Sequence, residues 1–212
     1  MVDNRTMRKY LLLLLVAISL TGCNSSYFEY PLVLPDKEME LDLRLAGHWV
    51  LDPAASGMDL GDYAFIQFLW DGSLDGGFAI TTYEVTKDGR SSDQRIGFAQ
   101  EIDGVGYLNF VRLIDHIGTE FESDKEGNTK LEYHILKYTF IGKDEVRFYD
   151  VDEDQIVAAI QKKQLSGHVF KEGHYRVSAK SDELLDFIRA NDIFDYSKVR
   201  VYHYHDIGIP QH

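Results

Sequence analysis

Apolar and polar side chains alternate in short runs through the middle of the chain. Residues 41–45 alternate leucine with charged side chains, and residues 78–86 are rich in the β-branched and aromatic side chains typical of strands. Turn residues separate the runs, and Asp103-Gly104 is a pair that favours a two-residue hairpin. The pattern predicts consecutive antiparallel strands at residues 41–51, 63–70, 78–86, 95–102, 105–114, 131–141 and 145–151.

The period of the apolar positions changes after residue 151. Asp152 is a good helix N-cap, and Gln155 stands at the third helical position, as in a capping box. The apolar stripe of this first helix comprises Ile156, Val157, Ile160 and Leu165. We expect Ser181 to cap a second helix. The side chains of that helix that face inward are Leu184, Leu185 and Ile188. Short strands are expected at residues 175–179 and 199–204.

Consecutive hairpins leave free strand edges unless the sheet closes on itself or pairs with another sheet. We therefore expect a mainly β protein whose antiparallel meander closes as a barrel, followed by a C-terminal α+β extension with two short helices. The expected division is a signal peptide at residues 1–22, a tether at 23–40, the barrel at 41–151, and the extension at 152–212, packed on the barrel.

The N-terminus has the order of side chains found in a secretory signal. Arg8 and Lys9 precede an apolar run at residues 11–20, which is shorter than the roughly 20 residues that a membrane-spanning helix needs. The next residues, Leu20-Thr21-Gly22-Cys23, resemble the lipobox of bacterial lipoproteins. The resemblance implies cleavage before Cys23, diacylglycerol on its thiol and acyl chains such as palmitate, so that residues 23–40 form a lipidated tether.

The same resemblance implies a location. Two or three acyl chains hold a protein at a membrane, whereas one chain binds only reversibly. Asn24 stands where aspartate favours the inner membrane in enterobacterial lipoproteins. The expected place is therefore the bacterial cell envelope, at the periplasmic face of the outer membrane. Met1 and Met7 are both open as the start of translation, because a complete signal follows either.

A second resemblance lies near the start of the first expected strand. Gly47-His48-Trp49 is similar to the Gly-x-Trp motif of the lipocalins and their relatives. In that family the tryptophan packs across the closed base of a β-barrel. The resemblance implies that the barrel is lipocalin-like and that Trp49 lies at its base.

Charge and cysteine content exclude several classes. The chain has 22 lysine and arginine residues against 35 aspartate and glutamate residues, a net charge of −13. Nucleic-acid binding needs clustered basic side chains, so no nucleic-acid partner is expected. A single cysteine excludes an internal disulfide, so packing must stabilise the fold. The acidic cluster Asp150, Asp152, Glu153 and Asp154 lacks the glycine of an EF-hand loop, and a helix start accounts for it.

Two histidines on one expected strand form the candidate metal site. In His203-Tyr204-His205 both imidazoles lie on the same face of the strand and can reach one zinc ion, but no third ligand stands at a metal-site spacing. Two surface histidines are the alternative interpretation. No Gly-x-Ser-x-Gly motif and no dinucleotide-binding loop occurs, so we assign no catalytic residue and no cofactor.

Aromatic side chains are frequent in the expected strands. In a wide barrel they would line a cavity for a small hydrophobic ligand, and in a narrow one they would fill the interior. The candidate ligand-binding residues are Trp49, Phe65, Trp70, Tyr83, Tyr107 and Phe110. Three functions stay open: binding of a hydrophobic ligand in the barrel, docking of an envelope protein on the acidic surface without a ligand, and metal-dependent hydrolysis at His203 and His205.

Overall fold

The structure, a computed structural model, describes residues 26–32, 42–59, 63–70, 77–87, 89–112, 132–170 and 174–206. Its helices are η1 (Leu43–Leu45), α2 (Glu153–Gln161), α3 (Ser181–Ala190) and η5 (Tyr196–Lys198), of which η1 and η5 are 3-10 helices. Its strands are β1 (Tyr27–Phe28), β2 (Gly47–Leu51), β3 (Tyr63–Trp70), β4 (Phe78–Thr86), β5 (Gly89–Ile102), β6 (Val105–Arg112), β7 (Tyr133–Ile141), β8 (Glu145–Asp150), β9 (Gly167–Val169), β10 (Tyr175–Val177) and β11 (Arg200–Tyr204).

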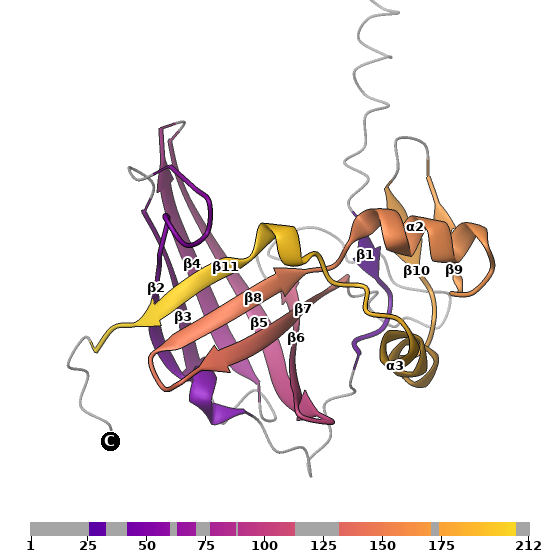
Figure 1. Ribbon diagram of the computed structural model, residues 1–212, viewed down its shortest axis with the longest axis horizontal. Helices are drawn as coiled ribbons and strands as arrows, with labels where there is room; N and C mark the ends of the chain where they lie inside the picture. Colours follow the sequence, from indigo (N-terminus) through magenta and orange to yellow (C-terminus); the bar gives the residue numbers. More distant parts are fainter. Residues whose placement is uncertain are drawn as a thin grey trace, which may run out of the picture.

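Eight of the strands form a closed antiparallel barrel (Figure 1). Strands β2 to β8 pair in sequence order, which confirms the predicted meander. Strand β11 then pairs with both β8 and β2 and closes the ring. This last strand comes from the segment assigned to the extension, so the two ends of the described chain meet in one sheet.

The hairpin between β5 and β6 has the predicted turn. Asp103 and Gly104 both have positive φ, at 53° and 79°. A two-residue turn with two positive φ values follows the right-handed twist of the flanking strands, and glycine adopts this conformation without strain. Strand β5 starts at Gly89, earlier than the predicted residue 95. The reason is that β5 pairs with the whole of β4, and the last residue of β4, Thr86, pairs with Gly89.

The strand predicted over residues 41–45 is wrong at its described positions. Leu43–Leu45 form the 3-10 helix η1, in which the Asp42 side chain accepts the N–H of Arg44 and the Ala46 N–H donates to the Leu43 carbonyl. Alternation of apolar side chains suits a strand, but this segment has an N-cap that satisfies its backbone locally. As a result Leu45 is buried while Leu43 is exposed.

The described residues build two hydrophobic cores. The first fills the barrel, and its largest fully buried side chains are Trp49, Phe68, Phe78, Tyr138 and Phe148. The second lies between the outer wall of the barrel and the extension, and it includes Phe28, Tyr107, Ile135, Ile156, Tyr175, Leu184 and Phe194. Strands β6 and β7 contribute to both cores, so their two faces are both apolar.

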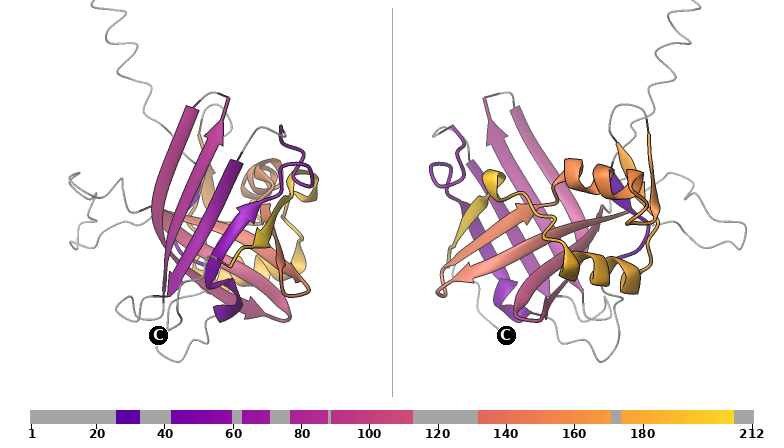
Figure 2. Two further views of the ribbon diagram at one scale, coloured as in Figure 1. Left: turned by 90° about the vertical axis from the view of Figure 1, so that its left-hand side faces the viewer. Right: turned by 45° about the vertical axis from the view of Figure 1, so that its right-hand side comes forward.

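The extension covers one side of the barrel (Figure 2). Strand β1 pairs in parallel with β10 and, through Phe28, antiparallel with the start of β7, while β9 pairs with β10. A strand from the segment predicted as the tether therefore connects the barrel sheet to the extension. The remaining tether residues, 23–25 and 33–40, lie outside the described residues.

The two predicted helices are present, and one of the two predicted caps is correct. Asp152 accepts the backbone N–H of Gln155 at 3.2 Å, and the Gln155 side chain donates back to Asp152 at 2.9 Å. The Ser181 cap is wrong, because Lys180 is the N-cap residue of α3. The Ser181 hydroxyl instead donates to the Pro31 carbonyl at 2.8 Å. It ties α3 to the N-terminal segment.

Candidate functional site

The six candidate aromatic residues do not line one cavity. Trp49 and Phe110 belong to the barrel core. Phe65 and Tyr83 stack on each other on the outer face of the barrel, with ring centroids 5.5 Å apart. Tyr107 belongs to the outer core beneath the extension. The side chain of Trp70 lies outside the described part of the chain.

Aromatic rings occupy the centre of the barrel. The ring of Phe68 lies 5.8 Å from that of Phe78 and 6.2 Å from that of Phe148. The Phe148 ring also contacts Tyr138 at 6.1 Å and Tyr202 at 5.8 Å. Offset and edge-to-face pairs at these distances are close-packed. The described interior thus has the arrangement expected of a narrow barrel, in which the aromatic side chains fill the space.

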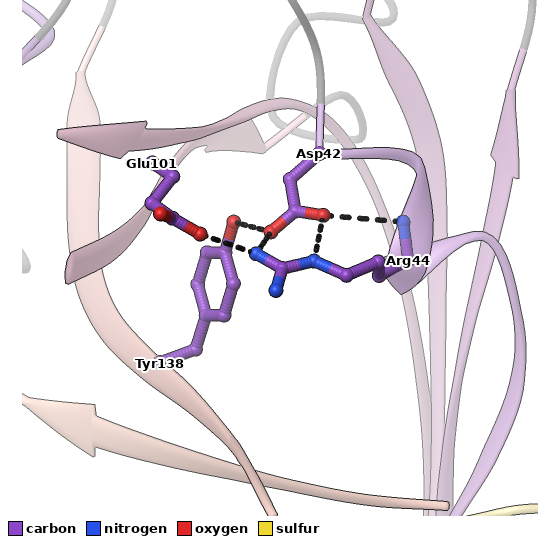
Figure 3. A network of polar contacts seen from close by, with 4 residues as sticks. All are labelled: Asp42, Arg44, Glu101 and Tyr138. Atoms are coloured by element: carbon purple, nitrogen blue, oxygen red, sulfur yellow. Dashed lines mark hydrogen bonds and ion pairs between the residues drawn. The ribbon is translucent and has the colours of Figure 1, made fainter. Parts of the chain in front are cut away.

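Trp49 and a polar network close the base of the barrel. Figure 3 shows the network, which consists of Asp42, Arg44, Glu101 and Tyr138. The Trp49 indole N–H donates to the Leu45 carbonyl of η1 at 2.8 Å. The Asp42 carboxylate accepts the Tyr138 hydroxyl at 2.8 Å and two hydrogen bonds from the Arg44 guanidinium. Arg44 also contacts Glu101 at 2.6 Å.

The ionisation of this network follows from its contacts. Burial alone would raise the pKa of Asp42, but the hydrogen bonds from Arg44 and Tyr138 outweigh it and lower the pKa. Burial raises the pKa of the Tyr138 hydroxyl, and the charge of Asp42 raises it further. The network is therefore a carboxylate held by two donors. The network closes the base of the barrel, and the buried negative charge of Asp42 is compensated by Arg44.

Phe110 lies nearer the other end of the barrel and is covered by polar groups. The Arg95 guanidinium stands 4.4 Å from its ring centroid, and the ring of His134 stacks on it at 5.3 Å. Arg95 is paired with Asp93 at 2.7 Å. Together with its packing in the barrel core, these contacts leave Phe110 only 6% exposed. It therefore serves as a platform for charged and polar side chains at this end.

A cleft of about 310 Å³ lies outside the barrel, between its wall and α3. Its lining comes from the hairpin of β5 and β6, from β7, and from α3 with the segment that follows it. We call it the α3 cleft, and its lining residues are Ile102, Asp103, Val105, Tyr107, Lys137, Leu185, Ile188, Arg189, Asp192 and Phe194. Its volume is at the lower end of the range for small-molecule sites, about 300–1,000 Å³.

Two basic side chains of the α3 cleft, Arg189 and Lys137, each contact an acidic residue of the cleft. Arg189 pairs with Asp103 at 2.8 Å and so joins α3 to the β5–β6 turn. The Lys137 ammonium donates to the Tyr196 hydroxyl and lies 3.7 Å from the Asp192 carboxylate. Burial raises the pKa of the Tyr196 hydroxyl, and its hydrogen bond to Asp192 adds to the effect. The cleft thus combines an apolar lining with fixed polar groups.

The two candidate metal ligands each face a different neighbour. His203 lies 3.3 Å from the Asp52 carboxylate. The ring centroid of His205 is 6.2 Å from that of His48, and burial lowers the pKa of His48, with His205 adding to the effect. Among the described residues, no three histidine, cysteine or acidic side chains come together as metal ligands. Both histidines lie on the barrel surface, beside β2.

No motif in the sequence distinguishes Lys137, Arg189 or Asp192 as site residues. Leu185 and Ile188 were predicted to face inward from the second helix, and both line the cleft. A further signal was present in β7, where Tyr133 and Ile135 on the outer face are as apolar as their inward neighbours. Apolar residues on both faces indicate a covered strand, and Lys137, which follows Ile135 on the outer face, indicates a specific polar contact there.

The closed eight-stranded antiparallel barrel, with a 3-10 helix at its base and helices on one wall, is a lipocalin-like architecture. Comparisons with protein-family models, with curated proteins and with solved structures found no match. No helix within the described ranges is both long and apolar enough to cross a bilayer. The predicted signal peptide and Cys23 lie outside those ranges.

Proposed function

We propose that the protein is a lipid-anchored binding protein of the bacterial cell envelope, and that it takes up a small hydrophobic ligand in the α3 cleft. Acyl chains on Cys23 hold it at the periplasmic face of the outer membrane. The barrel acts as a rigid scaffold, and its outer wall together with α3 forms the binding site. The protein has no catalytic step in this proposal.

The observation that carries the proposal is the contrast in packing between the two sides of the barrel wall. Side chains crowd the described interior, whereas the outer side has a cleft whose size and mixed lining suit a small molecule. Ile102, Val105, Leu185 and Ile188 offer it apolar surface, and burial of such surface contributes about 25 cal/mol per Å².

The anchor is tested by fractionation of bacteria that express the wild-type chain or Cys23→Ala. The wild type is expected to incorporate a labelled palmitate analogue and to stay with the outer membrane after a high-salt wash. The variant should incorporate none and lose the firm attachment. Equal membrane retention of the two chains, with no acyl mass on the wild type, would overturn this part of the proposal.

The site is tested by mass spectrometry of small molecules extracted from protein purified from envelopes. Leu185→Trp places an indole in the α3 cleft, and Ile141→Trp places one at the exposed end of β7, away from the cleft. We expect the same apolar molecule to co-purify with the wild type and with Ile141→Trp, and to be depleted with Leu185→Trp. Equal recovery from all three proteins would place the ligand elsewhere.

Docking of an envelope protein is a second candidate. The observation that favours it is a row of aromatic side chains on the outer face of neighbouring strands. The ring of Phe65 lies 5.5 Å from Tyr83 on β4 and 4.6 Å from His48 on β2. Aromatic side chains are enriched at protein interfaces. Site-specific crosslinking in cells from position 83 should trap a defined partner protein. If only the uncrosslinked monomer is found on the gel, the docking hypothesis is wrong.

A further inference from the structure

The charges of the α3 cleft differ in their exposure to solvent. The Lys137 side chain is 17% exposed, whereas Asp192 is 58% exposed and Asp103 is 67% exposed. Water screens the two carboxylates more than it screens the ammonium, so a ligand charge interacts more strongly with Lys137 than with the acids. The charged group of the cleft that interacts most strongly with a ligand is therefore the positive Lys137 ammonium.

The surroundings of Lys137 hold its ammonium in place. It donates to the Tyr196 hydroxyl, which itself donates to Asp192 at 2.6 Å. The ring centroids of Phe194 and Tyr196 lie 5.6 Å and 5.0 Å from the ammonium nitrogen. An ammonium has three N–H donors, and its nearest carboxylate oxygen is at 3.7 Å, longer than a hydrogen bond. An anionic acceptor in the cleft would form a shorter, charge-assisted bond.

We propose that the α3 cleft recognises an amphipathic carboxylate. The acid group of the ligand meets the Lys137 ammonium, and its aliphatic part lies along Ile102, Val105, Leu185 and Ile188. This inference rests on the proposed function and narrows the ligand from a hydrophobic molecule to one with a negatively charged end. Lys137 is the residue that determines this specificity.

The test compares three probes of the same chain length and different charge: octanoate, octanamide and octylammonium. Each is radiolabelled and dialysed to equilibrium against the full acylated chain in nanodiscs, with empty nanodiscs as the reference. We expect octanoate to bind at least tenfold more tightly than octanamide, which is the effect of one charge-assisted hydrogen bond. Octylammonium should bind most weakly.

Two variants assign the preference to a residue. Lys137→Met keeps the length of the side chain and removes its charge, and it should abolish the preference for octanoate while octanamide binds as before. Lys143→Met, on the exposed β7–β8 turn, is the matched control and should behave like the wild type. Thermal unfolding of both variants checks that the fold is intact.

The outcomes separate the inference from the proposed function. Equal binding of octanoate and octanamide, or tighter binding of octylammonium, overturns the inference and leaves a hydrophobic ligand in the cleft. A preference that survives Lys137→Met also overturns it. If none of the three probes binds above the reference and Leu185→Trp changes nothing, the proposed function fails and the inference fails with it.

Discussion

The barrel core and the outer core are both apolar and differ in how the chain builds them. The barrel core is formed mainly by strands that follow one another, with inward-facing side chains such as Phe68, Phe78 and Phe148, and only β11, which adds Tyr202, comes from a distant part of the chain. The outer core brings β1, the wall of β6 and β7, and the helices α2 and α3 together from distant parts of the sequence. One core is a folded meander, and the other is an assembly of separate segments.

This difference bears on where a ligand can bind. A meander closes on its own side chains, and η1 with Asp42 and Tyr138 then seals its base. Helix α3 instead meets the wall through a limited set of contacts, such as Arg189 with Asp103, and leaves the α3 cleft beside them. A lipocalin-like barrel can thus be a scaffold whose binding surface lies outside it.

The largest expected effect is loss of packing at the base of the barrel. Trp49→Ala removes a side chain that is 1% exposed together with its hydrogen bond to Leu45, so the free energy of unfolding should fall by about 3–5 kcal/mol. Tyr63→Ala removes a ring that is 45% exposed on the outer face and should cost less than about 1 kcal/mol. Urea titration measures both, and equal losses would contradict the assignment of Trp49 to the core.

The polar network at the base should give the next largest effect. Tyr138→Phe deletes the hydroxyl that Asp42 accepts, and it should cost about 1–3 kcal/mol at neutral pH. Tyr196→Phe removes the hydroxyl of a residue that is 48% exposed and should cost less. Equal costs for the two variants would show that the network contributes nothing specific to stability.

The same network predicts a dependence on pH. The folded-state pKa of Asp42 is lower than its usual value, so its contribution to stability is present above the unfolded-state pKa of about 3.9 and is lost as the pH falls through the folded-state value. The difference in unfolding free energy between the wild type and Tyr138→Phe should therefore narrow below about pH 4. A constant difference between pH 7 and pH 3 would contradict this reasoning.

Enlarged side chains compare the two sides of the wall directly. Ala99→Leu adds carbon atoms to a position in the barrel core with no exposed surface, and overpacking there should cost about 1–3 kcal/mol. Val105→Phe adds a larger volume in the α3 cleft and should stay within about 0.5 kcal/mol of the wild type while it weakens ligand binding. A large cost for Val105→Phe would mean that the cleft has no room for a ligand.

The smallest expected effect concerns the histidines on the outer face. The folded-state pKa of His48 is below its usual value, through burial and then through His205, so the folded state binds fewer protons than the unfolded state as the pH falls below about 6.5. Stability should decline across this range, and His48→Gln should reduce the decline measured by urea unfolding between pH 7.5 and pH 5. An identical decline in the variant would assign it to other groups.

Much of the architecture was predictable because its signals are local. Alternating side chains identified the strands, Asp103-Gly104 identified a hairpin, and Asp152 with Gln155 identified a helix start. Two local signals were misleading, at Leu43–Leu45 and at Ser181. At the first, the Arg44 N–H donates to the Asp42 side chain and starts a 3-10 helix. At the second, the Ser181 hydroxyl donates to the distant Pro31 carbonyl and does not cap its own helix. The lipid anchor at Cys23 stays a prediction.

The sequence by itself determined most strands of the barrel, their order in the meander and the two helices, because apolar period and turn chemistry act between residues close in the chain. Only the tertiary structure decided that β11 closes the barrel, that β1 joins the sheet of β10, and that α3 leaves a cleft on the wall. Two pairs fix charged side chains that line the α3 cleft: Lys137 with Tyr196, and Asp103 with Arg189. These residues are distant in sequence, and no local pattern relates them, since their distance depends on how the whole barrel closes.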